Sequence, residues 1–236
     1  MISVVCVYNN QQVLREYLEG SLDTQTASFE KIFIDNSQNS YKSAAKALNE
    51  GGARATGKYV LFIHQDVRIY PETWLSDVEK MLDSIRTFGI AGLAGKKDSE
   101  GVMSNIIHGI PPRPVGDTRI DRVETTQTVD ECAMIVPKSV FDVLRFDEEV
   151  CDNWHLYGVD YSLSVRSLGL DVLVLPVEAY HRSIGYPASE GYYKSLRKLL
   201  RKHRKKYEYV YTTMGDWRTA VPVSLSRLLR KTHVSR

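Results

Sequence analysis

The chain has 236 residues, of which 43% are apolar and 25% are charged, enough for one large soluble domain or such a domain with an appendage. Its net charge of +2 conceals an uneven distribution. From Lys194 onward, 13 Lys or Arg residues face only two acids, a charge of +11, and the preceding part of the chain carries −9. The basic end indicates an anionic partner, either a membrane surface or a nucleic acid.

The three cysteines argue against a disulfide framework, because they show no CxxC spacing and two of them, Cys6 and Cys132, lie in apolar runs. A free Cys in such a run behaves as a small apolar residue, which fits a reducing compartment. The first apolar run, residues 2–7, has the length of a strand and is too short for a signal peptide or a membrane span. We therefore expect a cytoplasmic protein.

Apolar periodicity predicts alternating strands and helices from the N-terminus onward. Strands are expected over residues 2–8, 31–34, 59–63 and 90–94, and helices over residues 11–22, 41–49 and 71–85. This alternation indicates a parallel sheet with helices on both faces. Residues 96–128, which contain several Pro and Gly, are expected to form a long loop or hairpin. Order resumes with a strand over residues 133–136, two helices beginning at residues 137 and 161, and a strand over residues 172–177.

Polar side chains follow the predicted strands at the points where they end. Ligands of open α/β sheets bind at the carboxyl ends of the strands, so these residues would line one edge of the sheet. Taken singly, each has a structural explanation: an acid in a turn or at a helix start, or a histidine satisfied in the core. The candidates for chemistry are Tyr8, Asn9, Asp35, Asp66, Asp160 and His181.

The ordered set of motifs resembles the family-2 glycosyltransferases, over roughly residues 2–184. The resemblance implies a single GT-A domain, Rossmann-like, with a mostly parallel central sheet and helices on both faces. The matching segments are Val4-Val5-Cys6-Val7-Tyr8-Asn9, Ile34-Asp35-Asn36-Ser37, the Asn49-x-Gly51-x-x-x-Ala55-x-Gly57 spacing, His64-Gln65-Asp66, Cys132-Ala133-Met134-Ile135, and Trp154 to Arg166 followed by His181.

Two positions depart from the usual family pattern: His64 replaces the first acid of Asp-x-Asp, and Val159 replaces the Glu of a Glu-Asp pair. A branch of the family resembles this sequence at both positions, with a His-x-Asp motif in place of Asp-x-Asp. The departures also leave open a non-catalytic member of the fold that binds a sugar nucleotide or acts as a scaffold. A nucleotidyltransferase is disfavoured, since no Gly-rich phosphate loop follows the first strand.

The resemblance implies an inverting transfer of a hexosyl or deoxyhexosyl group from a nucleotide-diphosphate donor to a glycan or lipid-linked acceptor. A divalent metal, Mn²⁺ or Mg²⁺, would be held by Asp66 and His181, with His64 as a further candidate ligand, and would neutralise the leaving diphosphate. Asp160 would be the general base that takes the proton of the acceptor hydroxyl. The predicted donor-binding residues are Cys6, Tyr8, Asn9, Asp35, Asn36, Asn49 and Gln65.

The basic end, residues 191–236, is predicted to be an amphipathic helical extension beyond a catalytic domain of residues 1–190. Residues 194–206 contain eight Lys or Arg and no acid, and Leu196, Leu199 and Leu200 fall on one helical face. Two alternatives remain: a helix packed on the domain, or docking of residues 193–231 on an anionic membrane as a peripheral protein of its inner face. No nucleic acid is expected, because no nucleic-acid-binding motif accompanies the charge.

Overall fold

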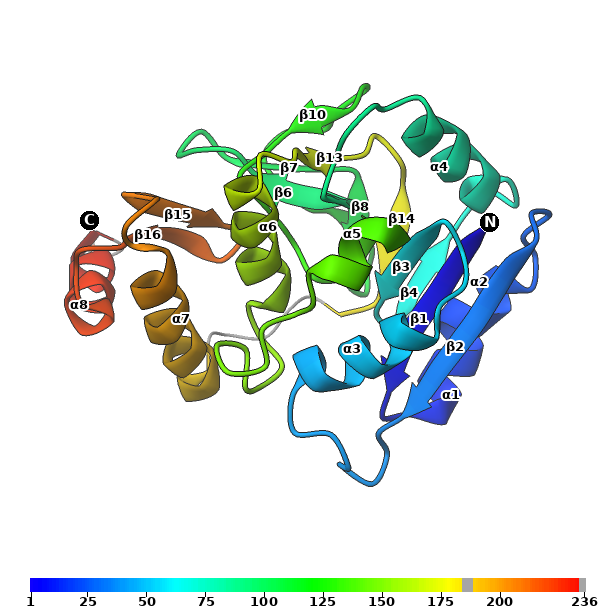
Figure 1. Cartoon of the computed structure of the whole chain (residues 1–236), viewed down its shortest axis with the longest axis horizontal. Helices are drawn as coiled ribbons and strands as arrows, with labels where there is room; N and C mark the ends of the chain where they lie inside the picture. Colours follow the sequence, from blue (N-terminus) through cyan, green and yellow to red (C-terminus); the bar gives the residue numbers. More distant parts are fainter. Residues whose placement is uncertain (184–188, 234–236) are drawn as a thin grey trace.

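The computed structural model describes residues 1–183 and 189–233, with the backbone alone beyond residue 228. Its centre is a seven-stranded sheet whose strands are, in spatial order, β10 (Glu124–Thr125), β13 (Val172–Val174), β5 (Ile90–Gly92), β12 (Ala133–Pro137), β3 (Tyr59–Ile63), β1 (Ile2–Tyr8) and β2 (Phe29–Asp35) (Figure 1). Five strands share one direction, and β12 and β10 run against their neighbours. The prediction of a mostly parallel central sheet is confirmed.

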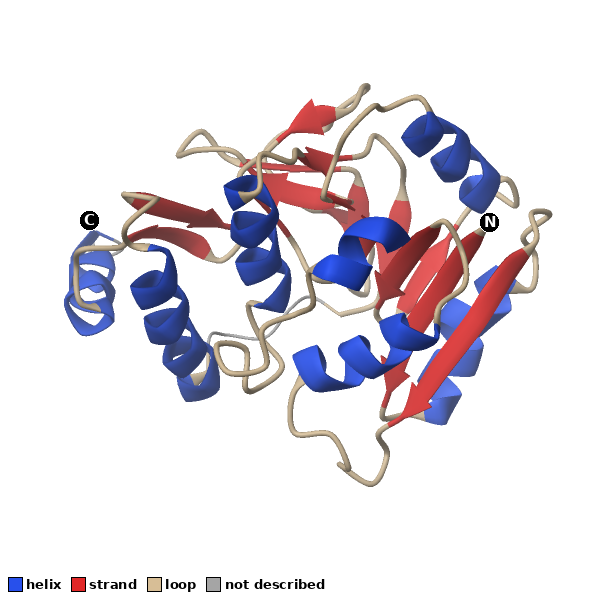
Figure 2. Cartoon of the chain, in the orientation of Figure 1, coloured by secondary structure: helices blue, strands red, loops and turns tan. Residues whose placement is uncertain are grey.

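Helices cover both faces of this sheet, as the sequence predicts (Figure 2). One face carries α1 (Gln11–Leu14), the π-helical turn η1 (Arg15–Glu19), α2 (Gly20–Leu22) and α4 (Trp74–Asp83); the other carries α3 (Ala44–Arg54), α5 (Lys138–Val143) and α6 (Tyr157–Ser167). Successive side chains of β3 enter opposite cores, Leu61 with the first set of helices and Phe62 with the second. A strand covered on both faces has no solvent side, and this explains why β3 is apolar throughout.

Residues 96–128, expected as a long loop or hairpin, contain antiparallel hairpin pairs and also short strands that join sheets the sequence did not predict. Two small sheets include them: β11 (Thr128–Val129), β6 (Ala94–Lys96) and β7 (Val102–Ser104) form one, and β4 (Val67–Ile69), β14 (Ala179–His181), β8 (Ile106–His108) and β9 (Arg113–Pro114) form the other. Strands of two or three residues are too short to show a periodic pattern in the sequence. Some of their partners, such as β14 for β8 and β13 for β10, also come from distant parts of the chain, which a local pattern does not reveal.

The C-terminal segment is only partly the helical extension that the sequence predicts. It contains α7 (Glu190–His203), a hairpin of β15 (Tyr209–Thr212) and β16 (Gly215–Arg218), and α8 (Val223–His233). The apolar face of α7, with Leu196 and Leu199, shares a third core with Leu163 of α6 and Trp217 of the hairpin. In the described residues no helix is long and apolar enough to cross a bilayer. The predicted membrane-docking segment, residues 193–231, includes the side chains of residues 229–231, which lie outside the described part. Residues 234–236 lie outside it as well.

Candidate active site

The carboxyl ends of β1, β2 and β3 meet at one edge of the central sheet and carry polar side chains. Tyr8 and Asp35 are direct partners in the β1–β2 register and therefore lie next to each other on one face. Gln65 ties the end of β3 to the end of β1: its Oε1 accepts the backbone N–H groups of Asn9 and Asn10 at 3.1 and 3.0 Å, and its Nε2 donates to Asn9 Oδ1 at 2.7 Å. The predicted edge therefore exists, and Gln65 holds it together.

Beside this edge, His64, Asp66 and His181 form a cluster whose ligand atoms all lie within 4.8 Å of one another. His181 Nε2 is 3.3 Å from Asp66 Oδ1, and His64 Nε2 is 3.1 Å from the hydroxyl of Tyr157. His64 and Asp66 directly follow β3, whereas His181 arrives because β14 pairs with β4, opposite Val67. The three residues proposed as metal ligands are thus brought together from two distant parts of the chain.

Electrostatics favour an ionised Asp66 and a neutral His64, the forms in which these two side chains bind a metal. Burial alone raises the pKa of Asp66, but the hydrogen bond and charge of His181, followed by the charge of His64, bring it below its ordinary value. Burial, reinforced by His181, lowers the pKa of His64. A carboxylate that stays ionised beside an imidazole that stays neutral needs no deprotonation before it binds a cation. Ligands about 2.1 Å from one cation lie at most about 4.2 Å apart, so the cluster fits a divalent ion after a small inward rotation.

Asp35 is exposed at the end of β2, where a ligand in solution can reach it. Its carboxylate accepts the backbone N–H of Ser37 at 2.7 Å, and this hydrogen bond lowers the pKa of Asp35. The side chain of Tyr8, the register partner on β1, also interacts with this carboxylate and lowers its pKa further. An ionised acid held in this way is suited to accept hydrogen bonds from the hydroxyl groups of a ribose.

Three of the predicted donor-binding residues have structural contacts instead. Cys6 is fully buried inside β1, so its side chain has no surface for a ligand. Asn36 is buried and binds the backbone N–H and C=O of Tyr41, closing the turn after β2. Asn49 on α3 binds the backbone N–H and C=O of Phe146 across the domain. The sequence does not distinguish these roles from ligand contacts, because Asn serves both and the backbone partners are invisible in it.

Asp160, the predicted general base, lies on the side of α6 that faces α7. Its side chain is 3% exposed; Oδ2 accepts from Lys202 Nζ at 2.7 Å, and Oδ1 lies 2.8 Å from His203 Nε2. Lys202 also binds Asp147 at 2.8 Å. The structure does not group Asp160 with the three residues of the metal cluster. Both of its oxygens are occupied by partners from the basic C-terminal segment.

Sequence reasoning did not select two acids, Asp130 and Glu131, that lie shortly before β12; the charge of Asp130 acts on His64. Because β12 runs antiparallel to β3, its start lies where β3 ends, and the backbone N–H of His64 donates to the carbonyl of Cys132 at 2.9 Å. Burial, and next the charge of Asp130, raise the pKa of Glu131 to about 8. In the sequence, these two acids stand before an apolar run, and this pattern could have marked them as candidates. Only the antiparallel pairing of β12 with β3 shows that they lie at this edge of the sheet.

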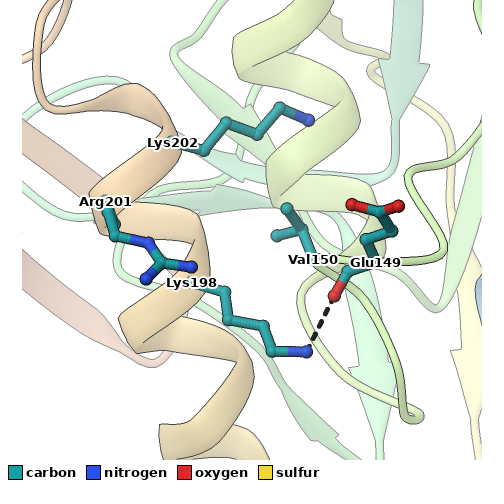
Figure 3. A pocket seen from close by; sticks show the side chains of 5 residues that line it. All are labelled: Glu149, Val150, Lys198, Arg201 and Lys202. Carbon is teal, nitrogen blue, oxygen red and sulfur yellow. Dashed lines mark hydrogen bonds between the residues drawn. The ribbon is translucent and has the colours of Figure 1, made fainter.

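A cavity of about 450 Å³ lies elsewhere, between α7 and the loop before α6, and is lined by Glu149, Val150, Lys198, Arg201 and Lys202 (Figure 3). Its cations are largely neutralised. Lys198 binds the Glu149 carbonyl and Asp152, each at 2.8 Å, and Lys202 binds Asp147 and Asp160. A pocket with these internal ion pairs is a poor site for a diphosphate, so the strand edge with its cluster remains the candidate active site.

The parallel-rich α/β sheet, with an acid and two histidines at its carboxyl edge, agrees with the GT-A fold that the sequence resemblance implies. Residues 3–203 match the family described as "Glycosyltransferase like family", and the chain belongs to that family. A search of curated protein sequences finds no match.

Solved structures with the same fold agree with this assignment. The mannosyltransferase PcManGT from Pyrobaculum calidifontis, in complex with GDP-Man and Mn²⁺, shares 13% identity with a TM-score of 0.61, covering 87% of this chain and 64% of that one. TarS residues 1–349 from S. aureus, in complex with UDP-GlcNAc, shares 17% identity with a TM-score of 0.57, covering 85% and 66%. GalNAc-T7 with UDP, GalNAc and Mn²⁺ shares 11% identity with a TM-score of 0.59, covering 84% and 48%. The chain thus spans about two thirds or less of these proteins.

Proposed function

We propose that this protein transfers a sugar from a nucleotide-diphosphate donor to a glycan or lipid-linked acceptor. The observation that carries the proposal is the cluster of His64, Asp66 and His181 at the carboxyl edge of the sheet, beside the exposed Asp35. Two structures of similar fold contain GDP-Man with Mn²⁺ and UDP-GlcNAc, which supports a nucleotide sugar as the donor. The nucleoside would lie over Tyr8 and Asp35, with its diphosphate at the cluster.

A divalent ion, Mn²⁺ or Mg²⁺, would be held by Asp66 and His181, with His64 as the third ligand. Bound there, it would neutralise charge on the leaving diphosphate. Two imidazoles in the ligand set favour Mn²⁺ over Mg²⁺, which prefers oxygen ligands. Tyr157 fixes the ring of His64 through the 3.1 Å contact, and Gln65 keeps the ends of β1 and β3 together. These contacts orient the ligands before the donor arrives.

Transfer with inversion requires a base on the far side of the sugar, and Asp160 is our proposed base. Its contacts with Lys202 and His203 set a condition: one carboxylate oxygen must exchange a partner for the acceptor hydroxyl. Asp130 and Glu131 are the alternative acids, because the charge of Asp130 acts on His64 and the pKa of Glu131 is raised to about 8. Single variants D160N, D130N and E131Q separate them: the base is the residue whose variant loses transfer while donor binding persists.

We also propose peripheral attachment to an anionic membrane on its inner, cytoplasmic face. The apolar face of α7 is buried, so insertion of that face is excluded and the contact would use its outer basic side chains. On α8, Leu225 and Leu228 are 46% and 60% exposed and supply apolar anchors beside that charge. Co-sedimentation with vesicles tests this: binding that is equal for neutral and anionic vesicles, or absent, contradicts the proposal.

The deciding experiment measures both binding and chemistry. A panel of nucleotide sugars is screened by thermal shift with and without Mn²⁺, since a ligand of the folded state stabilises it by mass action. The donor that binds is then incubated with the protein, and release of nucleoside diphosphate is measured. Metal-dependent binding together with slow donor hydrolysis supports a transferase. Binding without any hydrolysis or transfer favours a non-catalytic sugar-nucleotide-binding protein, and no binding at all contradicts both.

A further inference from the structure

A row of side chains leads away from the metal cluster across the sheet of β4, β14, β8 and β9. His108 is the direct partner of His181 in the parallel β8–β14 pair, and Arg113 is the direct partner of His108 in the antiparallel β8–β9 pair. Directly opposed residues on neighbouring strands project from the same face of a sheet. His181, His108 and Arg113 therefore lie in line on one face, each one strand further from Asp66.

Distances and electrostatics agree with this arrangement. Neighbouring strands lie about 4.8 Å apart, so the backbones of His181 and Arg113 are separated by about 10 Å, with His108 between them. Burial lowers the pKa of His108, and the charges of His181 and then Arg113 act in the same direction. Both register partners of His108 are therefore close enough to its ring for their charges to affect its pKa.

The hairpin that carries His108 and Arg113 is held against β14. Gly109 N–H donates to the carbonyl of His181 at 3.0 Å, and the hydroxyl of Tyr180 donates to the carbonyl of Gly109 at 3.0 Å. Gly109 has a φ of 77°, a left-handed conformation that a side chain would disfavour. The row is consequently anchored to the strand that supplies His181, so its position relative to the cluster is set by backbone contacts.

Arg113 is an uncompensated cation. It is exposed, and in the described part of the chain its guanidinium makes neither an ion pair nor a hydrogen bond. Other arginines of this region have partners: Arg119 pairs with Glu178, and Arg68 lies over the ring of Tyr17 at 4.5 Å. A free guanidinium with a neighbouring imidazole is suited to bind a phosphate through two parallel N–H contacts.

The direction of the row decides which phosphate fits. Tyr8 and Asp35 lie on the β1–β2 side of β3, where the nucleoside would bind, and the donor diphosphate would reach the cluster from there. The row begins at the cluster and continues through β14, β8 and β9, beyond the donor. We propose that His108 and Arg113 form a subsite for a phosphate group of the acceptor, as a lipid-linked acceptor carries; this subsite rests on the proposed sugar transfer.

Isothermal titration calorimetry tests the subsite with inorganic phosphate as the probe. The protein is first saturated with Mg²⁺ and with UDP or GDP, whichever binds, and phosphate is then titrated into wild type, Arg113→Gln and Arg86→Gln. Arg86 is the matched control, because it is exposed and makes no ion pair or hydrogen bond among the described residues. We expect Arg113→Gln to weaken phosphate binding about tenfold, the scale of one charge-assisted contact, and to change nucleotide affinity less than twofold.

Each other outcome has a definite meaning. Equal phosphate affinity in wild type and Arg113→Gln, a similar loss in Arg86→Gln, or no phosphate binding by wild type overturns the subsite. A tenfold loss of nucleotide affinity in Arg113→Gln assigns the row to the donor diphosphate and overturns the acceptor assignment. If wild type binds no nucleotide, phosphate is titrated without it: the proposed sugar transfer then fails, whereas an Arg113-dependent phosphate site would still stand as an anion site.

Discussion

The carboxyl edge of β3 and the C-terminal segment treat their aspartates in opposite ways. Asp66 at the edge has two histidines as neighbours and remains 19% exposed, open to a ligand. Asp160 has a lysine and a histidine from α7 as partners and is 3% exposed. Asp66 is thus accessible to a ligand, whereas both carboxylate oxygens of Asp160 bind α7 and attach it to α6. An acid in a motif acquires its role from its partners.

The same comparison holds for the basic residues. Along α7, Lys194 and Lys198 both bind Asp152, and Lys202 bridges Asp147 and Asp160. These lysines join the C-terminal segment to an acidic part of the domain. The hairpin adds a further contact, since the hydroxyl of Thr213 donates to Asp130 at 2.8 Å. The segment therefore braces both Asp160 and an acid near His64, and it acts as part of the domain.

The largest expected effect on ligand affinity is that on metal-dependent nucleotide binding at the carboxyl edge of β3. Asp66→Asn removes the only anionic ligand of the cluster, and we expect Mn²⁺-dependent nucleoside-diphosphate affinity to fall about 1,000-fold, roughly 4 kcal/mol. Calorimetric titration with Mn²⁺ present measures it. The matched control is Asp121→Asn, an exposed acid outside the cluster, which should bind as wild type does. Unchanged affinity in Asp66→Asn would mean that the cluster holds no metal.

The next effect concerns the C-terminal segment. Asp160→Asn leaves Lys202 and the buried His203 without their charged partner, and removal of one member of a buried pair costs about 3 kcal/mol. The control is Asp142→Asn, which breaks the exposed pairs with Lys138 and Arg145 and should cost less than about 1 kcal/mol. Urea unfolding measures both. Equal small losses would show that the contacts of Asp160 do not brace α7.

Glu131 gives a pH-dependent test at the junction of the two regions. Its pKa in the folded protein is about 8, against an ordinary value of 4.5, so its contribution to stability is complete below pH 4.5 and is lost as the pH rises through 8. We expect Glu131→Gln to be more stable than wild type by roughly 4–5 kcal/mol at pH 8.5 and equal to it at pH 4. The exposed Glu100→Gln should show no such divergence, and parallel curves for Glu131→Gln would refute the shift.

The smallest effect concerns the outer surface of the C-terminal segment. Replacing the exposed Leu225 and Leu228 by Ser removes two apolar anchors of about 0.5 kcal/mol each, so binding to anionic vesicles should weaken about fivefold. Folding should be unaffected, because both side chains project from α8 into solvent. Val143→Ser, at another exposed apolar position, is the control. Unchanged vesicle binding in the double variant would mean that Leu225 and Leu228 do not anchor the protein, so that only the basic side chains could attract it to anionic vesicles.

The sequence by itself determined the central sheet and the strand-end part of the site. Leu61 and Phe62 belong to a run apolar at every position, which only a strand covered on both faces requires, and Asp66 ends that run. Strand ends of a parallel sheet meet at one edge, so local pattern sufficed to bring Tyr8, Asp35 and Asp66 together.

Tertiary structure alone decided the rest, because the remaining contacts join residues far apart in the chain. Cys6 and Asn49 match a motif, yet Cys6 is buried and Asn49 binds the backbone of Phe146. In the segment expected as a long loop or hairpin, β8 and β10 pair with β14 and β13 from the distant end of the chain. The sequence left the basic run of α7 either packed on the domain or docked on a membrane, and it did not reveal that Lys202 binds Asp160, 42 residues away in the chain. Local periodicity reports which face of an element is buried, whereas the partner of a buried charge depends on how the elements pack.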